Sequence, residues 1–345
     1  MTCRPHGRSL SDHDKDLQVK FHKNERFDST FSLVGVDASI ANAFRRIMVA
    51  EIPSIAIEDV YVFNNTSIIQ DEVLCHRIGL IPFTGSREGF RWMGWYKKPP
   101  GDEDPAAKAA AARSGEYNNP AEQNPSDQNT LVLRLDVECD WAENGKKLAK
   151  EGERDPDKIY INSSVYAHQI TYLVQGAQGQ FFSGENAIRP MNPDILIAKL
   201  RPGQKISMQM HAIKGIGADH AKFSPVATAS YRLLPYINIK APILGAEAKK
   251  FARCFPRGVI ELEDDAETGQ KKAVVGDTMK DTVSRECLRH DEFKDKVQLG
   301  RVRDHFIFSV ESTGQYESDE LFVESVKALK AKAERFKRNL ADLMR

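Results

Sequence analysis

The chain has 345 residues, 41% of them hydrophobic, and its 49 lysines and arginines balance its 49 aspartates and glutamates. This length fits about two domains of ordinary size, and the apolar content is sufficient for packed cores. A formal net charge of zero gives no bulk electrostatic support for binding nucleic acid. The longest apolar runs are strand-sized and the polar N-terminus lacks the apolar core of a signal peptide, so we expect a soluble, intracellular protein.

The cysteines are isolated from one another in the sequence. No pair has the CxxC or CxH spacing that would place two ligands on one metal ion. We therefore predict reduced thiols that mostly pack against other side chains, with no metal and no cofactor. The five residues are Cys3, Cys75, Cys139, Cys254 and Cys287.

Residues 1–26 are predicted to form an N-terminal arm, because the segment is charged and lacks sustained periodicity. A strand over residues 27–36 follows, with Phe31 and Leu33 on one face. The next segment predicts a helix with Asp37 as its N-cap and Pro53 as its stop. Apolar residues recur on one face of this helix at helical spacing: Ile40, Ala43, Phe44, Ile47 and Met48.

Residues 55–69 predict two strands around a turn at residues 64–66, because asparagine tolerates left-handed backbone angles. Between Lys97 and Asn129, proline, alanine, asparagine and aspartate dominate, which predicts a long flexible loop. A period of two, with apolar residues on one shared face, returns at residues 131–139 and 205–213. The middle third of the chain is therefore predicted to be β-rich.

The C-terminal third predicts two short strands within residues 255–277, a strand from His305, and a long helix capped by Ser318. Apolar residues of this helix alternate at steps of four and three, the pattern of a continuous packing seam. Burial of such side chains is worth about 1.5–3 kcal/mol each, so the helix needs a surface to pack against. The seam comprises Phe322, Val326, Leu329, Ala333, Phe336, Leu340 and Leu343.

The opposite face of the final helix is basic. Its cations are either solvated near a helix C-terminus or in contact with an acidic or nucleic-acid partner, and the sequence leaves both interpretations open. The residues are Lys327, Lys330, Lys332, Arg335, Lys337 and Arg338.

Three further patterns have competing interpretations. Residues 215–217, Gly-Ile-Gly, favour a tight turn, since the third glycine of a dinucleotide loop and the Lys-Ser/Thr of a P-loop are missing. His211, Asp219 and His220 could form an acid–base site in an enzyme, although a structural loop is the simpler interpretation. Residues 91–98 mix aromatic and basic side chains that could stack on bases, although packing within the domain is favoured.

Three segments together resemble the alpha-type subunits of cellular RNA polymerases, a family with archaeal and bacterial members. They are residues 40–85, residues 215–235, and the sequence FIFSVESTG of residues 306–314 followed by the final helix. Residues 281–308 are similar to the signature of the subunit shared by eukaryotic polymerases I and III. The polymerase II counterpart usually has a zinc-binding cysteine cluster in its insert domain. The segment after Gly85 has no cysteine, which argues against zinc, against the iron–sulfur site of some archaeal relatives and against polymerase II.

The resemblance implies an α+β fold. A discontinuous dimerisation domain, built from a sheet and long helices, would carry an inserted β-rich domain. The expected boundaries are residues 1–26 for the arm, 27–86 and 213–345 for the two parts of the dimerisation domain, and 87–212 for the insert domain with a flexible loop at 97–129.

The resemblance also implies a function: a non-catalytic assembly subunit of polymerases I and III, in the nucleus and nucleolus. It would support transcription of ribosomal RNA and of small structured RNAs such as 5S and tRNA. The expected partners are a small alpha-like subunit as heterodimer partner, the two largest subunits, and small subunits of the assembly platform, with little or no direct nucleic-acid contact and no membrane association. The alternatives are the polymerase II counterpart, a nucleic-acid-binding module or a free-standing enzyme.

Specific residues follow from the same resemblance. The heterodimer interface is expected at Ile40, Ala43, Phe44 and Ile47, together with the seam from Phe322 to Leu343. Arg45 and Arg46 match the paired arginines of the family, near which the large subunits dock. Guanidinium groups suit such a role because they form bidentate contacts with carboxylates. No catalytic or metal-binding residue is expected.

Overall fold

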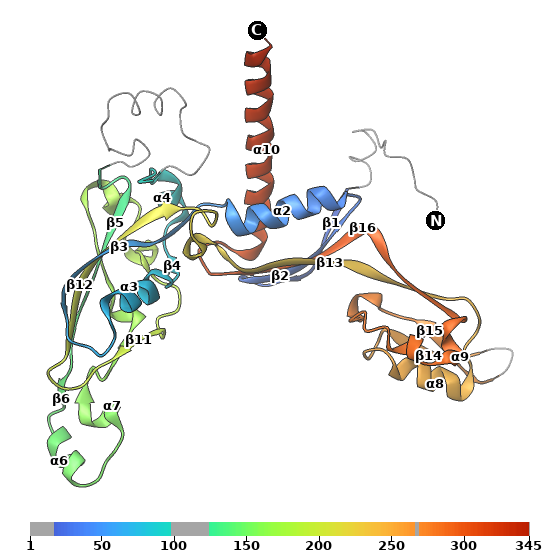
Figure 1. Ribbon diagram of the computed structural model, residues 1–345, viewed down its shortest axis with the longest axis horizontal. Helices are drawn as coiled ribbons and strands as arrows, with labels where there is room; N and C mark the ends of the chain where they lie inside the picture. The colour runs from blue at the N-terminus through green and yellow to red at the C-terminus, as the bar shows by residue number, and fades with distance from the viewer. Residues whose placement is uncertain (1–16, 98–123, 266–268, 345) are drawn as a thin grey trace. The chain divides into compact units, whose positions relative to one another are not determined.

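The computed structural model describes residues 17–97, 124–265 and 269–344, which divide into two compact units (Figure 1). Unit 1 combines residues up to Asn24 with residues 29–43 and 230–309, and unit 2 combines residues 25–28, 44–229 and 310–345. Both contain helices and sheets, which confirms the predicted α+β class. The predicted boundaries at residues 26, 86 and 212 are not the limits of these units, so the division into dimerisation and insert domains stays a prediction. Residues 1–16 of the predicted arm and 98–123 of the predicted loop lie outside the described residues.

A four-stranded sheet forms the framework of unit 1. Its order is β1 (Gln18–Asn24), β2 (Asp28–Val34), β16 (Val297–Ser312) and β13 (Val226–Ile239). Alternation in β2 buries Phe31 and Leu33, and the Phe31 ring stacks on Phe308 with centroids 5.2 Å apart. Strand β1 was missed by the sequence analysis, which had assigned it to the arm. Leu17, Val19 and Phe21 alternate with polar residues, but this apolar pattern is short and all seven side chains of the strand are exposed. The strand pairs with β2 in antiparallel fashion.

A second core in unit 1 packs helices against a hairpin. It contains α8 (Gly245–Arg253), α9 (Asp291–Lys294) and the hairpin of β14 (Ile260–Asp264) with β15 (Lys271–Val275), which confirms the two strands predicted there. The Phe251 ring contacts the rings of Phe255 and Phe293, with centroids 5.1 and 5.2 Å apart. Three aromatic side chains therefore form the centre of this core.

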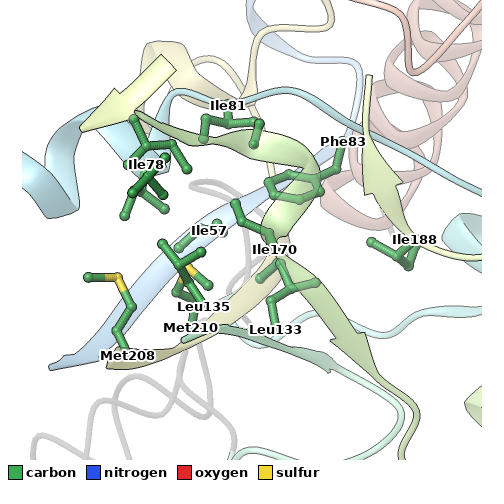
Figure 2. Packing of buried hydrophobic residues seen from close by; sticks show 14 of the residues in the cluster. Ile57, Ile78, Ile81, Phe83, Leu133, Leu135, Ile170, Ile188, Met208 and Met210 are labelled. Atoms are coloured by element: carbon green, nitrogen blue, oxygen red, sulfur yellow. The ribbon is translucent and has the colours of Figure 1, made fainter. Parts of the chain in front are cut away.

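Unit 2 is built on a second sheet, ordered β3 (Ser54–Asn65), β12 (Lys205–Gly215), β5 (Thr130–Glu138) and β9 (Thr171–Leu173). Figure 2 shows Leu133 and Leu135 of β5 and Met208 and Met210 of β12 in one buried cluster with Ile78. The alternation predicted for both strands is confirmed, because their apolar side chains are buried in this cluster.

Short elements complete unit 2. Its described short α-helices are α3 (Asp71–Gly79), α4 (Arg87–Trp92), α6 (Gly145–Lys150) and α7 (Pro156–Ile159). Its two-stranded sheets pair β4 (Phe83–Thr84) with β10 (Arg189–Pro190), β8 (Ser164–Tyr166) with β11 (Leu196–Lys199), and β6 (Asp140–Trp141) with β7 (Tyr160–Ile161).

The prediction of two strands across residues 55–69 is wrong. Strand β3 runs on to Asn65 and pairs with β12, and a loop follows it. The Asn65 side chain fixes this loop, donating to the Ile69 carbonyl at 3.0 Å and accepting from the Ser67 hydroxyl at 2.7 Å. Asparagine thus holds a loop rather than a hairpin turn, because its amide bonds to the backbone ahead of it.

Two long helices carry the predicted interface. In α2 (Ala38–Ala50) the Ser39 amide donates to an Asp37 carboxylate oxygen at 2.8 Å, which confirms Asp37 as the cap. The final helix, α10 (Ser318–Leu343), is also confirmed, but Glu317 occupies its N-cap position. Ser318 is not the cap because its hydroxyl donates to the Glu25 carbonyl at 2.8 Å. No described helix combines the length and apolar content that a membrane crossing requires.

Candidate functional site

The first half of α10, residues 318–332, is held to the rest of unit 2, and we call it the anchored half. The Phe322 ring meets the Phe44 ring edge-on with centroids 5.3 Å apart, and the two residues are 8% and 9% exposed. At the other end of this half, the Lys332 ammonium donates to both carboxylate oxygens of Glu51, at 2.8 and 2.9 Å. An aromatic contact and an ion pair thus tie α10 to α2 and to the residue that follows it.

Ion pairs from α4 hold the first turns of α10. Arg87 pairs with Glu317 at 3.7 Å and with Glu320, and Arg91 pairs with Glu324 at 3.3 Å. The two arginines lie four residues apart on α4, and their partners lie at the same spacing along the start of α10. Cations on one helix therefore meet carboxylates on the other along a matched row.

The segment before α10 is bound to the start of β3. The Gln315 side chain accepts from the Ile55 amide at 3.0 Å and donates to the Ile55 carbonyl at 2.6 Å, as a neighbouring strand would do. The Tyr316 hydroxyl donates to the Pro53 carbonyl at 2.8 Å. Burial raises the pKa of Tyr316 to about 12, because the phenolate would be charged in an apolar surrounding.

The second half of α10, residues 333–343, is exposed, and we call it the open half. Every side chain that the structure describes in it is exposed to solvent. Besides the exposed Ala333, its seam residues are large and apolar: Phe336 is 71% exposed, Leu340 47% and Leu343 85%. Three such side chains at seam spacing on one helix face are typical of a protein–protein contact.

The other predicted interface residues fall into two groups. Phe44 and Ile47 are 9% and 2% exposed, so they are buried within the chain. Ile40 is 42% exposed and Ala43 is half-buried. Within the seam, Val326 is 40% exposed and Leu329 is half-buried. Both residues lie between the buried Phe322 at the start of the seam and the exposed Phe336 further along it.

The two predicted docking arginines differ. Arg45 is half-buried and already interacts with other groups of the chain, whereas Arg46 is exposed. Arg46 is therefore the guanidinium group on α2 that is presented to solvent.

The two histidines of the enzyme hypothesis have separate structural contacts. The His211 ring packs edge-on against Tyr61 with centroids 4.8 Å apart, and burial lowers its pKa. The His220 imidazole accepts from the Lys222 amide at 3.1 Å and so caps a short 3₁₀ turn. Within the described hydrogen bonds, none joins His211, Asp219 and His220 to one another.

The aromatic and basic segment at residues 91–98 is packed into unit 2. The Trp92 ring stacks on Phe181 with centroids 4.8 Å apart. The Lys214 ammonium lies 5.2 Å from the centre of the Trp95 ring. Both tryptophans therefore contact side chains of the same unit, which agrees with the packing interpretation.

The glycine pair at residues 215–217 also serves packing. A Cβ atom on Gly215 would lie 2.7 Å from the Phe223 ring, and one on Gly217 would collide with the Val49 carbonyl. The close approach of these side-chain and backbone atoms explains both glycines without a phosphate ligand.

One partly buried charge network was missed by the sequence analysis. Burial would raise the pKa of Glu58, but hydrogen bonds from Lys222 and Lys97 outweigh it and lower the pKa below its usual value. Residues 58, 97 and 222 are far apart in the sequence, so no local spacing signals this contact. The hydrogen bonds between Gln315 and Ile55 and the ion pair between Arg87 and Glu320 were missed for the same reason.

Comparisons with known proteins agree with the resemblance. Residues 30–333 match the family described as the RNA polymerase Rpb3/Rpb11 dimerisation domain. The chain is 48% identical over 323 residues to DNA-directed RNA polymerases I and III subunit RPAC1 of Saccharomyces cerevisiae, covering 94% of this chain and 87% of that protein. It is 45% identical over 327 residues to the human subunit of the same name, covering 92% and 85%.

The polymerase II type is more distant. DNA-directed RNA polymerase II subunit rpb3 of Dictyostelium discoideum is 27% identical over 324 residues, covering 92% of each chain. The identity to the proteins named for polymerases I and III is much higher over a similar length, so the predicted resemblance to that type is confirmed. The chain therefore belongs to the family of DNA-directed RNA polymerase subunits that contain the Rpb3/Rpb11 dimerisation domain, and its sequence is of the type shared by polymerases I and III.

Proposed function

We propose that this chain is a non-catalytic assembly subunit, which binds a small alpha-like subunit through the open half of α10. The observation that supports this most directly is the exposure of Phe336, Leu340 and Leu343 on one face of that helix. Covering such side chains is worth about 1.5–3 kcal/mol each when burial is complete. An apolar partner surface would therefore gain substantial free energy by packing on the open half.

The buried part of the predicted interface has a supporting role in this proposal. Phe44, Ile47 and Phe322 hold the anchored half in place, and the exposed seam residues make the contact. Val326 and Leu329 continue the contact surface into the anchored half. Ile40 and Ala43, which lie in unit 1, stay proposed contacts of the same partner.

Docking of the two largest subunits is the second part of the proposal. Arg46 is exposed on α2 and suits bidentate contacts to a carboxylate of such a partner, while Arg45 supports the site from a half-buried position. Small subunits of the assembly platform would complete the complex. The chain would thereby support transcription of ribosomal RNA, 5S RNA and tRNA in the nucleus and nucleolus without performing a chemical step of its own.

Affinity purification of the polymerase through this subunit tests both contacts. The full-length variant Phe336→Ser/Leu340→Ser should lose the small alpha-like subunit and, with it, the two largest subunits. Arg46→Ala should keep the small subunit and lose at least half of the large ones. A matched control, Ile161→Ser/Val174→Ser, removes two side chains of similar exposure elsewhere in unit 2 and should keep all partners. Full retention of the small subunit by a folded Phe336→Ser/Leu340→Ser variant would contradict the proposal.

A further inference from the structure

The positions beside the α10 seam are occupied by lysines and uncharged residues. In heptad terms the seam has Val326, Ala333 and Leu340 at a, with Phe322, Leu329, Phe336 and Leu343 at d. The positions that follow each d residue hold Val323, Lys330, Lys337 and Met344. The positions that precede each a residue hold Ser325, Lys332 and Asn339. All charge beside the seam is therefore positive, and we call Lys330, Lys332 and Lys337 the flanking lysines.

The flanking lysines differ in how far the chain itself neutralises them. Lys332 is bound by Glu51 at 2.8 Å. Lys330 reaches Glu334 only at 4.0 Å, and both side chains are mostly exposed, so this pair is weak. Lys337 takes part in none of the ion pairs between described side chains. Lys330, near the end of the anchored half, and Lys337, in the open half, therefore lack strong compensation within the described chain.

We infer that the flanking lysines select the partner of α10: a protein whose apolar docking face is bordered by carboxylates, and not a second copy of this chain. The inference rests on the proposed function, since it concerns the same surface. Charges beside a helical seam set partner choice, because they lie next to the flanking residues of the facing helix. Two copies of this chain would place lysines beside lysines, whereas a face bordered by aspartate or glutamate would pair with them.

An acidic-bordered protein face fits the surface better than a nucleic acid does. Phosphates would pair with the lysines but would leave Phe336, Leu340 and Leu343 uncovered. A protein face that is apolar in the middle and acidic at its borders covers these side chains and neutralises Lys330 and Lys337 together. Burial of apolar area and pairing of charge then favour the same partner.

Charge reversal of the purified full-length chain tests the inference without a further partner. The probe is the flank variant Lys330→Glu/Lys337→Glu, studied alone and in an equimolar mixture with the wild-type chain by sedimentation equilibrium. At positions 330 and 337, lysines and glutamates are brought together only in the mixture, which should associate at least tenfold more tightly than either protein alone. Raising the salt from about 0.1 M to about 1 M should reduce this difference, because the Debye length falls from about 10 to about 3 Å.

A control with the same change in net charge isolates the flanks. Lys327→Glu/Arg338→Glu reverses two cations at positions away from the seam, and its mixture with the wild-type chain should associate within about twofold of the wild-type chain alone. Circular dichroism confirms that each variant is folded. The inference is overturned if the control mixture associates as tightly as the flank mixture, or if the wild-type chain alone does so.

The native partner separates this inference from the proposed function. In affinity purification the flank variant should lose at least three-quarters of the small alpha-like subunit. If the flank variant keeps that subunit while Phe336→Ser/Leu340→Ser loses it, the apolar contact stands and the selection by charge fails. If both variants keep it, the proposed function fails as well.

Discussion

The two halves of α10 follow one heptad pattern but have opposite surroundings. In the anchored half, Phe322 packs on Phe44, and arginines of α4 pair with the carboxylates of the first turns. In the open half, Phe336 and Leu343 are exposed, and the described side chains are in solvent. A heptad pattern thus predicts that a helix face will be covered, but it does not say whether the same chain or another protein covers it.

The largest expected effect separates the two halves by stability. Phe322→Ala should lower the free energy of unfolding by about 3–5 kcal/mol, because it leaves a cavity beside Phe44. Phe336→Ala should change it by less than about 0.5 kcal/mol, because the ring is exposed. Chemical denaturation of the isolated chain measures both. Equal losses of stability would remove the distinction between an anchored and an open half.

A second substitution tests how the anchored half is fixed. Gln315→Leu removes both hydrogen bonds to Ile55 and leaves a buried N–H and a buried carbonyl unpaired, which should cost about 2–4 kcal/mol. Gln70→Leu is the matched control, since Gln70 is exposed and its side chain makes no capping bond. Equal midpoints of urea denaturation for the two variants would mean that the anchored half does not depend on this pairing.

The smallest effect depends on pH. Tyr316→Phe should cost about 1 kcal/mol near neutral pH, through the lost bond to the Pro53 carbonyl. The raised pKa of about 12 means that folded Tyr316 stays neutral above pH 10, where the unfolded chain ionises. Ionisation of Tyr316 in the unfolded chain should therefore lower the stability of the wild-type chain as the pH rises through this range. The variant has no ionisable group at this position and lacks this contribution. Urea denaturation measures the free energy of unfolding of both proteins, and the difference between them should become smaller from about pH 8 to about pH 11. A difference that does not change with pH would contradict the burial of Tyr316.

Sequence periodicity predicted the elements with one buried face. The alternation in residues 131–139 and 205–213 matches the burial of β5 and β12, and the apolar spacing predicted α2 and α10. Strand β1 was missed because its alternating apolar residues, Val19 and Phe21, are few and lie among polar and charged neighbours, and every side chain of the strand is exposed. A local signal was also wrong where a distant group bound the side chain. Ser318 was predicted to cap α10, but its hydroxyl donates to the Glu25 carbonyl.

The candidate site was only partly predictable in the same way. Sequence spacing gave every residue of the seam, and the order of the three matching segments gave the family. It did not separate Phe44 and Phe322, which cover each other, from Phe336, which remains exposed. Periodicity reports which side of a helix is apolar, whereas burial depends on what else the chain places there.

The sequence by itself determined the family, the α+β class, and the two amphipathic helices, because these depend on residue order and local spacing. Tertiary structure alone decided that α10 is anchored through Arg87, Gln315 and Glu51 along its first half and left open along its second. Those contacts join residues between 233 and 281 positions apart, and such pairings follow from packing rather than from local spacing.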